Sequence, residues 1–181
     1  METTIRHAIE GVTFGARGCS SCTCDPCDCN PCTCGDSRTP SYPEWRISGC
    51  ALTSGTVNGV NVAQQYMLSL TQPVKAGSYT DWYSVLLLPE ETSDEQCKAL
   101  LAVFESTLNS WPAEAGDRPA LRSSVYHTRI GLLFGEENAG LSVRFDPQKS
   151  RLIRTGDFTA TPRIWTYKGE VALRDVFNTG R

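Results

Sequence analysis

The cysteines are the side chains whose types and spacing point most directly to chemistry. Seven of the nine cysteines in the chain fall in one stretch that alternates C-x-x-C with C-x-C and, from Ser20 onward, repeats every five residues. These are Cys19, Cys22, Cys24, Cys27, Cys29, Cys32 and Cys34. No apolar residue interrupts the stretch, so hydrophobic burial cannot order it. A metal or a set of disulfides therefore has to supply the crosslinks.

Crowded thiolates select soft or borderline metals, namely Cu(I), Zn(II) or an iron–sulfur cluster, over Mg or Ca. The C-x-x-C spacing is typical of zinc and iron–sulfur sites, whereas C-x-C pairs are unusual among iron–sulfur ligands. One zinc ion takes four ligands, which leaves several thiols unexplained. A polynuclear Cu(I)–thiolate cluster uses the sulfurs best and a two-zinc arrangement comes next. We therefore expect Cu(I) or Zn(II), with an iron–sulfur cluster less favoured.

Two cysteines and both histidines lie outside this repeat. Cys50 is either an eighth metal ligand or a small buried apolar residue, and the sequence does not choose between them. Cys97 lies on the apolar stripe of an expected helix, which favours core packing. His127 is better explained as a satisfied core or surface histidine than as a distal ligand. His7 would reach the cluster only if the chain folds back. The predicted ligands are thus the seven cysteines of the repeat and Cys50.

No catalytic machinery is evident. The sequence contains no dinucleotide-binding glycine motif, P-loop, serine-hydrolase elbow or H-E-x-x-H zinc motif. Enzymatic activity is left open, a non-enzymatic role is favoured, and no catalytic residue is assigned. The formal net charge is -3 and the basic residues are scattered, so we expect no nucleic-acid partner.

The N-terminus lacks the cationic start and apolar core of a signal peptide. Apolar runs such as Val85–Leu88 are too short to cross a bilayer. We therefore expect a cytoplasmic protein. A reducing compartment keeps thiols free, which favours metal over disulfides.

The elements that must position the cysteines follow from the rest of the pattern. We predict an N-terminal arm over residues 1–18, forming an edge strand or a docking segment. A Cys-rich metal-binding segment over 19–35 and a linker over 36–44 follow it. The remaining residues, 45–181, are long enough to form one α+β body with a core of its own.

Within the body, Asn58-Gly59 predicts a hairpin turn between two strand-like runs. A helix is expected from Asp94 to about Ser110. Ser93 and Gln96 have the spacing of a capping box, and an apolar stripe follows them. Further strand-like runs surround the helix. In one of them, Leu141–Phe145, apolar residues alternate with Ser142 and Arg144, so we expect one face of that strand to be exposed to solvent. The predicted fold class is α+β, with an antiparallel β-sheet body covered by one long amphipathic helix.

Several of these elements together resemble a bacterial family of unknown function, the DUF1326 domain. The matching elements are Cys22–Cys24, Cys27–Cys29, Pro31-Cys32-Thr33-Cys34, Gly49-Cys50-Ala51-Leu52, Gly59-Val60-Asn61-Val62 and Ser93-Asp94-Glu95-Gln96. The similarity spans about Cys22 to Thr166. It implies metal handling, and a metal-binding membrane protein as partner. This chain departs from the family pattern in having more cysteines in a regular repeat, and no catalytic residue is carried over.

Three hypotheses follow. In the first, the chain binds Cu(I), or failing that zinc, on the thiolate cluster and buffers, stores or transfers the ion, while the body docks a partner or forms a homo-oligomer. In the second, one or two zinc ions staple the N-terminal arm onto the body, and the protein serves in assembly or interaction. In the third, the cysteine pairs cycle through disulfides in a redox role, although no thioredoxin-like context surrounds them.

Overall fold

The computed structural model describes residues 4–19, 43–74, 82–106, 123–156 and 161–180, and most of these lie in strands. The elements are β1 (His7–Cys19), β2 (Pro43–Val57), β3 (Val60–Asn61), β4 (Tyr66–Pro73), β5 (Trp82–Pro89), α1 (Asp94–Ser106), β6 (Ser124–Phe134), β7 (Asn138–Phe145), β8 (Arg151–Arg154) and β9 (Trp165–Gly180).

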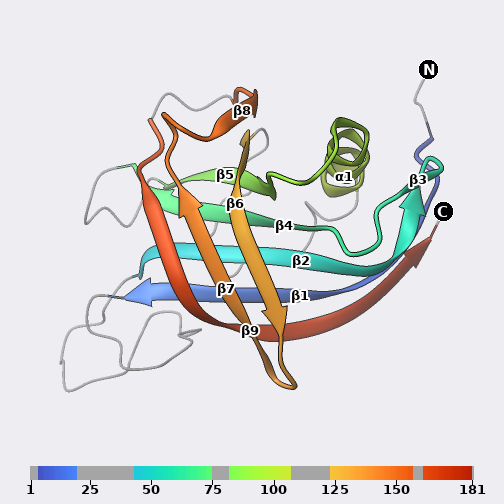
Figure 1. Ribbon diagram of the computed structural model, residues 1–181, viewed down its shortest axis with the longest axis horizontal. Coiled ribbons are helices and arrows are strands. Elements are labelled where there is room, and N and C mark those ends of the chain that lie inside the picture. Colours follow the sequence, from blue (N-terminus) through green and yellow to red (C-terminus); the bar gives the residue numbers. More distant parts are fainter. Residues whose placement is uncertain (1–3, 20–42, 75–81, 107–122, 157–160, 181) are drawn as a thin grey trace.

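The sheet closes on itself. Its strands follow the order β1, β9, β7, β6, β5, β4, β2 and β3, and β1 also pairs with β2. Neighbouring strands are antiparallel except for β5 and β6, which run parallel. A parallel pair needs a long crossover connection, and the segment that contains α1 supplies it. Figure 1 shows β6, β7 and β9 crossing in front of β1, β2 and β4.

Inward-facing side chains of the closed sheet form one large apolar cluster. It includes Phe14 of β1, Leu68 of β4, Leu87 of β5 and Phe145 of β7, each with an exposed fraction of 0%. Strand residues alternate between the two faces of a sheet, so every second residue of these strands points inward. The alternation predicted for Leu141–Phe145 is confirmed, because its three apolar residues are buried and its two polar ones are exposed.

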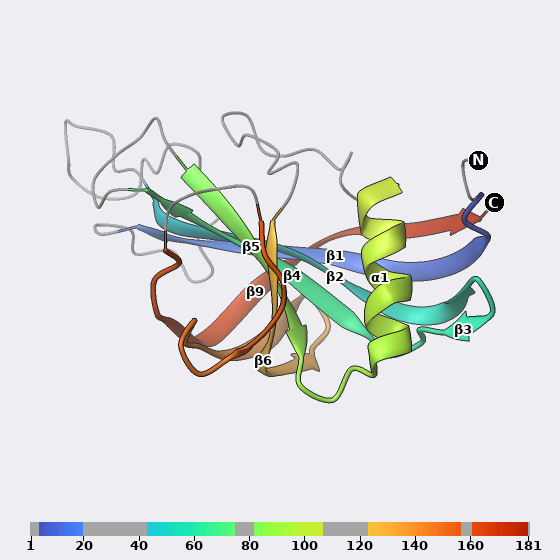
Figure 2. The same ribbon diagram turned by 90° about the horizontal axis from the view of Figure 1, so that it is seen from above.

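A second apolar cluster lies on the outer side of the sheet, under α1. The helix contributes Cys97, Leu100 and Val103, which pack with outward-facing residues such as Leu86 and Leu88 of β5. Figures 1 and 2 place α1 near β3, at one end of the long strands. The predicted capping box is present: the Ser93 hydroxyl accepts from the Gln96 amide at 3.2 Å, and the Gln96 side chain accepts from the Ser93 amide at 3.1 Å.

The predicted α+β fold, with one long amphipathic helix covering an antiparallel sheet, is wrong. The described residues are mainly β-structure, and α1 is the only helix among them. Its 13 residues span about 20 Å. The 15 residues of β2 span roughly 50 Å, so the helix covers only part of one outer face. The sheet buries its largest apolar cluster by closing on itself and has no need of a helical cover there.

The two ends of the described chain are strands of the sheet. β1 was predicted as an edge strand or a docking segment, but it pairs on one side with β2 and on the other with β9. The hairpin predicted at Asn58-Gly59 is confirmed, since Val57 pairs with Val60. Both turn residues have positive φ, 49° and 82°, which suits the tight turn between two antiparallel strands.

Candidate functional site

The cysteine segment connects two strands that are paired with each other. β1 ends at Cys19, β2 begins at Pro43, and these two residues are register partners. The predicted ligands Cys22, Cys24, Cys27, Cys29, Cys32 and Cys34 lie in the intervening stretch, outside the described residues. The chain therefore enters and leaves this stretch at neighbouring points of one rigid ladder, about 5 Å apart.

A cluster of aromatic rings lies beside the point where β1 and β2 meet the cysteine segment, which we call the root of the segment. The Trp45 ring centroid is 5.1 Å from that of Trp165 and 5.2 Å from that of Tyr167, and both contacts are edge-to-face. Trp45 lies opposite Gly18, where an added Cβ would fall 2.1 Å from the indole nitrogen. Gly18 thus admits the indole against the backbone of β1. The strands that carry the cysteine segment are thus packed against each other as far as Gly18 and Trp45.

Two arginines lie next to each other just before this root. Arg17 and Arg46 are register partners on β1 and β2, with exposed fractions of 4% and 9%. A third, Arg174, lies over Gly15, where an added Cβ would be 3.0 Å from its guanidinium carbon. Like charges on directly opposed positions disfavour strand pairing. Arg17 of β1, Arg46 of β2 and Arg174 of β9 thus place three guanidinium groups on three neighbouring strands.

Cys50 lies in the core. It is 3% exposed within the apolar cluster under α1, and its strand neighbours are Thr13 and Met67. Burial raises the pKa of its thiol to about 12, against a smaller lowering by a hydrogen bond with the Met67 backbone. It lies seven residues beyond Pro43, roughly 23 Å along β2. These features favour the packing alternative for Cys50, because a metal ligand has to be a thiolate.

Cys97 and the two histidines are also buried. Cys97 packs in the cluster under α1, as its place on the helical stripe predicted, and burial, with the Asp94 charge, raises the pKa of its thiol. His7 begins β1, so twelve residues, roughly 40 Å of strand, separate it from Cys19. His127, in the middle of β6, is 5% exposed. The structure thus places none of these three beside the root of the cysteine segment.

The environment of His127 keeps its ring neutral. Burial lowers the pKa of His127, and the charge of Arg151 lowers it further, while Asp94 and Glu90 oppose this shift. Its Nε2 has no hydrogen-bond partner in the described part of the chain. Among the described residues, no group of three or more His, Cys, Asp or Glu side chains is arranged to hold a metal ion.

One further site is not evident from the sequence. It is an open groove over β6, β7 and β9, and its lining includes Arg129, Arg144 and Lys168. Alternation in β7 placed Arg144 on a wet face. The signal that was lacking is the register, which brings Arg129 and Lys168 beside it from strands distant in sequence.

Comparison with known proteins gives no identification, since no family model, curated protein or solved structure matches this chain. Within the described residues, no helix has the length and apolar character needed to span a membrane.

Proposed function

We propose that this chain is a thiolate metal-binding protein that buffers, stores or transfers Cu(I), or failing that Zn(II), through the cysteine segment between β1 and β2. The observation that carries this proposal is the regular C-x-x-C and C-x-C repeat, which begins at Cys19, the register partner of Pro43. Holding both ends of the segment lowers the entropy lost when several sulfurs gather around one small volume. The thiolates would be the ligands and the ion would be cargo.

Release of the ion would proceed by exchange of one sulfur ligand for a sulfur of the acceptor. We propose the cytoplasm as the compartment, and a metal-binding membrane protein or a second copy of this chain as the partner.

The pairing of β1 argues against zinc as a staple for the N-terminal arm. β1 already has hydrogen-bonded neighbours on both sides, so it needs no metal to attach it to the body. A structural zinc would then order only the connecting segment. The redox alternative can be distinguished from both metal-binding hypotheses, because it requires free thiols to be lost reversibly as disulfides.

The decisive experiment measures metal content by mass spectrometry, with a free-thiol count, on full-length protein purified without oxygen or chelator. Several copper ions per chain, lost in the double variant Cys27→Ser/Cys29→Ser, are the expected result. The control is Cys50→Ala/Cys97→Ala, which removes the two core thiols and should leave the metal content unchanged. One or two zinc ions that do not exchange would favour the structural role. Protein without metal, with its thiols paired as disulfides, would overturn both metal hypotheses.

A further inference from the structure

The outer face of β6, β7 and β9 holds an open groove of about 450 Å³. It lies on a part of the sheet that α1 does not cover. Its polar side chains come from all three strands: Arg129, Ser142, Arg144, Thr166 and Lys168. The groove thus gathers three cationic groups and two hydroxyl groups, and no acidic residue is among those that line it.

The register brings the cations close together. Arg129 on β6 is directly opposite Arg144 on β7, and Lys168 on β9 is opposite Ser142, two residues before Arg144. Directly opposed Cβ atoms are about 5 Å apart and diagonal ones about 7–8 Å. Like charges directly opposite each other weaken a sheet. An arrangement that weakens the fold and persists without internal compensation is a mark of a functional site.

Compensation for these charges within the described residues is slight. The Nε of Arg129 lies 4.0 Å from a Glu90 carboxylate oxygen, and both side chains are more than half exposed. Such exposed pairs contribute little. The side chains of Arg144 and Lys168 have no hydrogen bond or ion pair in the part of the chain that the structure describes. These two cations are therefore available to a ligand.

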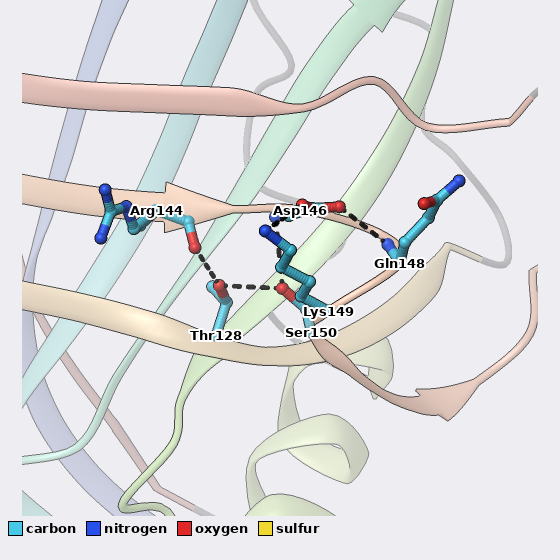
Figure 3. A network of polar contacts seen from close by, with 6 residues as sticks. All are labelled: Thr128, Arg144, Asp146, Gln148, Lys149 and Ser150. Carbon is cyan, nitrogen blue, oxygen red and sulfur yellow. Dashed lines mark hydrogen bonds and ion pairs between the residues drawn. The ribbon is translucent and has the colours of Figure 1, made fainter.

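The backbone that carries Arg144 is held from below (Figure 3). The hydroxyl of Thr128, which is 1% exposed, donates to the Arg144 carbonyl oxygen at 2.6 Å. The Ser150 hydroxyl donates to the Thr128 hydroxyl at 3.1 Å. The guanidinium of Arg144 points away from this network. A fixed backbone with a free cationic end is suited to ligand binding, because little order has to be imposed when the ligand arrives.

Gly131, opposite the lining residue Ser142, leaves an open side next to the groove. It faces Ser142 across a regular stretch of the β6–β7 ladder, and its φ is not positive. An added Cβ would meet only the Ser142 Cβ, at 4.0 Å. Neither backbone conformation nor crowding requires glycine here. Glycine within a strand weakens it and often marks the close approach of a ligand.

We propose that this groove binds a small phosphate-bearing anion. Arginine forks match phosphate oxygens with two parallel hydrogen bonds, lysine adds a compact charge, and the hydroxyls of Ser142 and Thr166 donate further. Arg129 lies opposite Arg144 and Lys168 lies diagonal to it, and this arrangement suits a group that carries several charges at one point. Acidic peptide side chains, by contrast, carry one charge each. This site lies on strands other than β1 and β2 and does not depend on the proposed metal function.

The test is isothermal titration calorimetry of full-length protein with inorganic tripolyphosphate at low ionic strength. Binding is expected for the unmodified chain, and salt should weaken it. Arg144→Gln and Lys168→Gln should each weaken binding by about tenfold or more, since each removes charge-assisted hydrogen bonds. The charge-matched control is Lys98→Gln, at an exposed position of α1, which should bind as the unmodified chain does.

A pair of glycine variants separates shape from charge. Gly131→Val fills the open side while keeping every cation, and it should reduce binding. Gly140→Val lies on the same face but opposite Leu133, where an added Cβ makes an ordinary contact at 3.8 Å, and it should bind normally. Absence of tripolyphosphate binding by the unmodified chain, or full affinity in Arg144→Gln, would overturn the proposal. So would an equal loss in Lys98→Gln, or tighter binding of a single-stranded oligonucleotide than of tripolyphosphate.

Discussion

The closed sheet has two outer regions that share the same kind of backbone but differ in the polarity of their side chains. Under α1, outward positions are apolar, as at Leu86 and Leu88. In the groove over β6, β7 and β9 they include charged residues such as Arg144 and Lys168. The inner face is apolar beneath both regions. Closure of the sheet therefore secures the core, and only the presence of the helix decides which outer residues must be apolar.

Strand β6 passes from one region to the other. Val125, His127 and Arg129 are alternate residues and thus share one face of the strand. Val125 belongs to the cluster under α1, His127 is buried but polar, and Arg129 is exposed at the groove. The change from packing to possible binding thus takes place within five residues of one strand. The covered region contributes stability, and the uncovered region is free to recognise a ligand.

The largest difference between the regions should appear when a leucine is truncated. Leu88→Ala removes a side chain with an exposed fraction of 0% under α1 and should lower the free energy of unfolding by about 2–5 kcal/mol. Leu133→Ala, at a position 79% exposed on β6, should change it by less than about 0.5 kcal/mol. Urea unfolding under reducing conditions measures both. Equal losses would mean that Leu133 is covered in solution and that the comparison fails.

The next effect concerns the support beneath the groove. Thr128→Val keeps the shape of the side chain but removes the donor to the Arg144 carbonyl, and the Ser150 hydroxyl loses its acceptor. The expected loss of stability is about 1–3 kcal/mol, because the partly buried bonds to the Arg144 carbonyl and from the Ser150 hydroxyl are both lost. Val125→Thr is the reverse exchange under α1 and should also destabilise. A neutral result for Thr128→Val would show that water replaces the hydroxyl and that the support is not required.

Much of the local structure could be predicted from the sequence, but the closed sheet could not. The capping box at Ser93 and the turn at Asn58-Gly59 depend on residues a few positions apart, so both can be predicted from the sequence. The pairing of β1 with β9 joins residues such as Ala8 and Gly180, which lie at opposite ends of the chain. No local pattern encodes that contact. Without it, the sheet was expected to need a long helix as its cover.

The candidate sites divide in the same way. The cysteine repeat can be recognised from the sequence, because all of its cysteines lie in one short stretch. Cys50 remained ambiguous between ligand and core until its burial was known, since alternation alone does not say what covers a face. The cations of the groove come from β6, β7 and β9 and become neighbours only through strand register. Sites assembled from distant strands are therefore the part of this protein that sequence patterns left out.

A smaller effect is expected at the start of the cover itself. Ser93→Ala removes the side-chain acceptor for the Gln96 amide at the N-terminus of α1 and should cost about 1 kcal/mol of stability. Ser142→Ala makes the same chemical change on the uncovered face, where it should have little effect. Urea midpoints of the two variants provide the measurement. If Ser93→Ala were as neutral as Ser142→Ala, packing alone would fix the helix.

His127, between the two regions, should make stability depend on pH. Its pKa is lower in the folded chain than its ordinary value of 6.5, mainly through burial and then through Arg151, against the opposing charges of Asp94 and Glu90. The unfolded chain therefore takes up the proton first. The contribution of the neutral His127 ring to the free energy of unfolding is fully present above about pH 6.5. It is lost as pH falls toward the folded-state pKa. His127→Gln should flatten that slope in urea unfolding between pH 7.5 and 5.5, and an unchanged slope would assign it to other groups.

The smallest effect has the opposite sign and tests why the uncovered region tolerates opposed cations. Arg144→Thr removes the repulsion with Arg129 and places a β-branched residue in a strand, so stability should rise by about 0.2–1 kcal/mol. The gain should shrink at high salt, which screens exposed charges. Lys168→Thr, opposite Ser142, makes the same exchange without a directly opposed cation and should gain less. If Arg144→Thr instead destabilises the fold at every salt concentration, the guanidinium serves packing, and the two outer regions differ less than their side chains indicate.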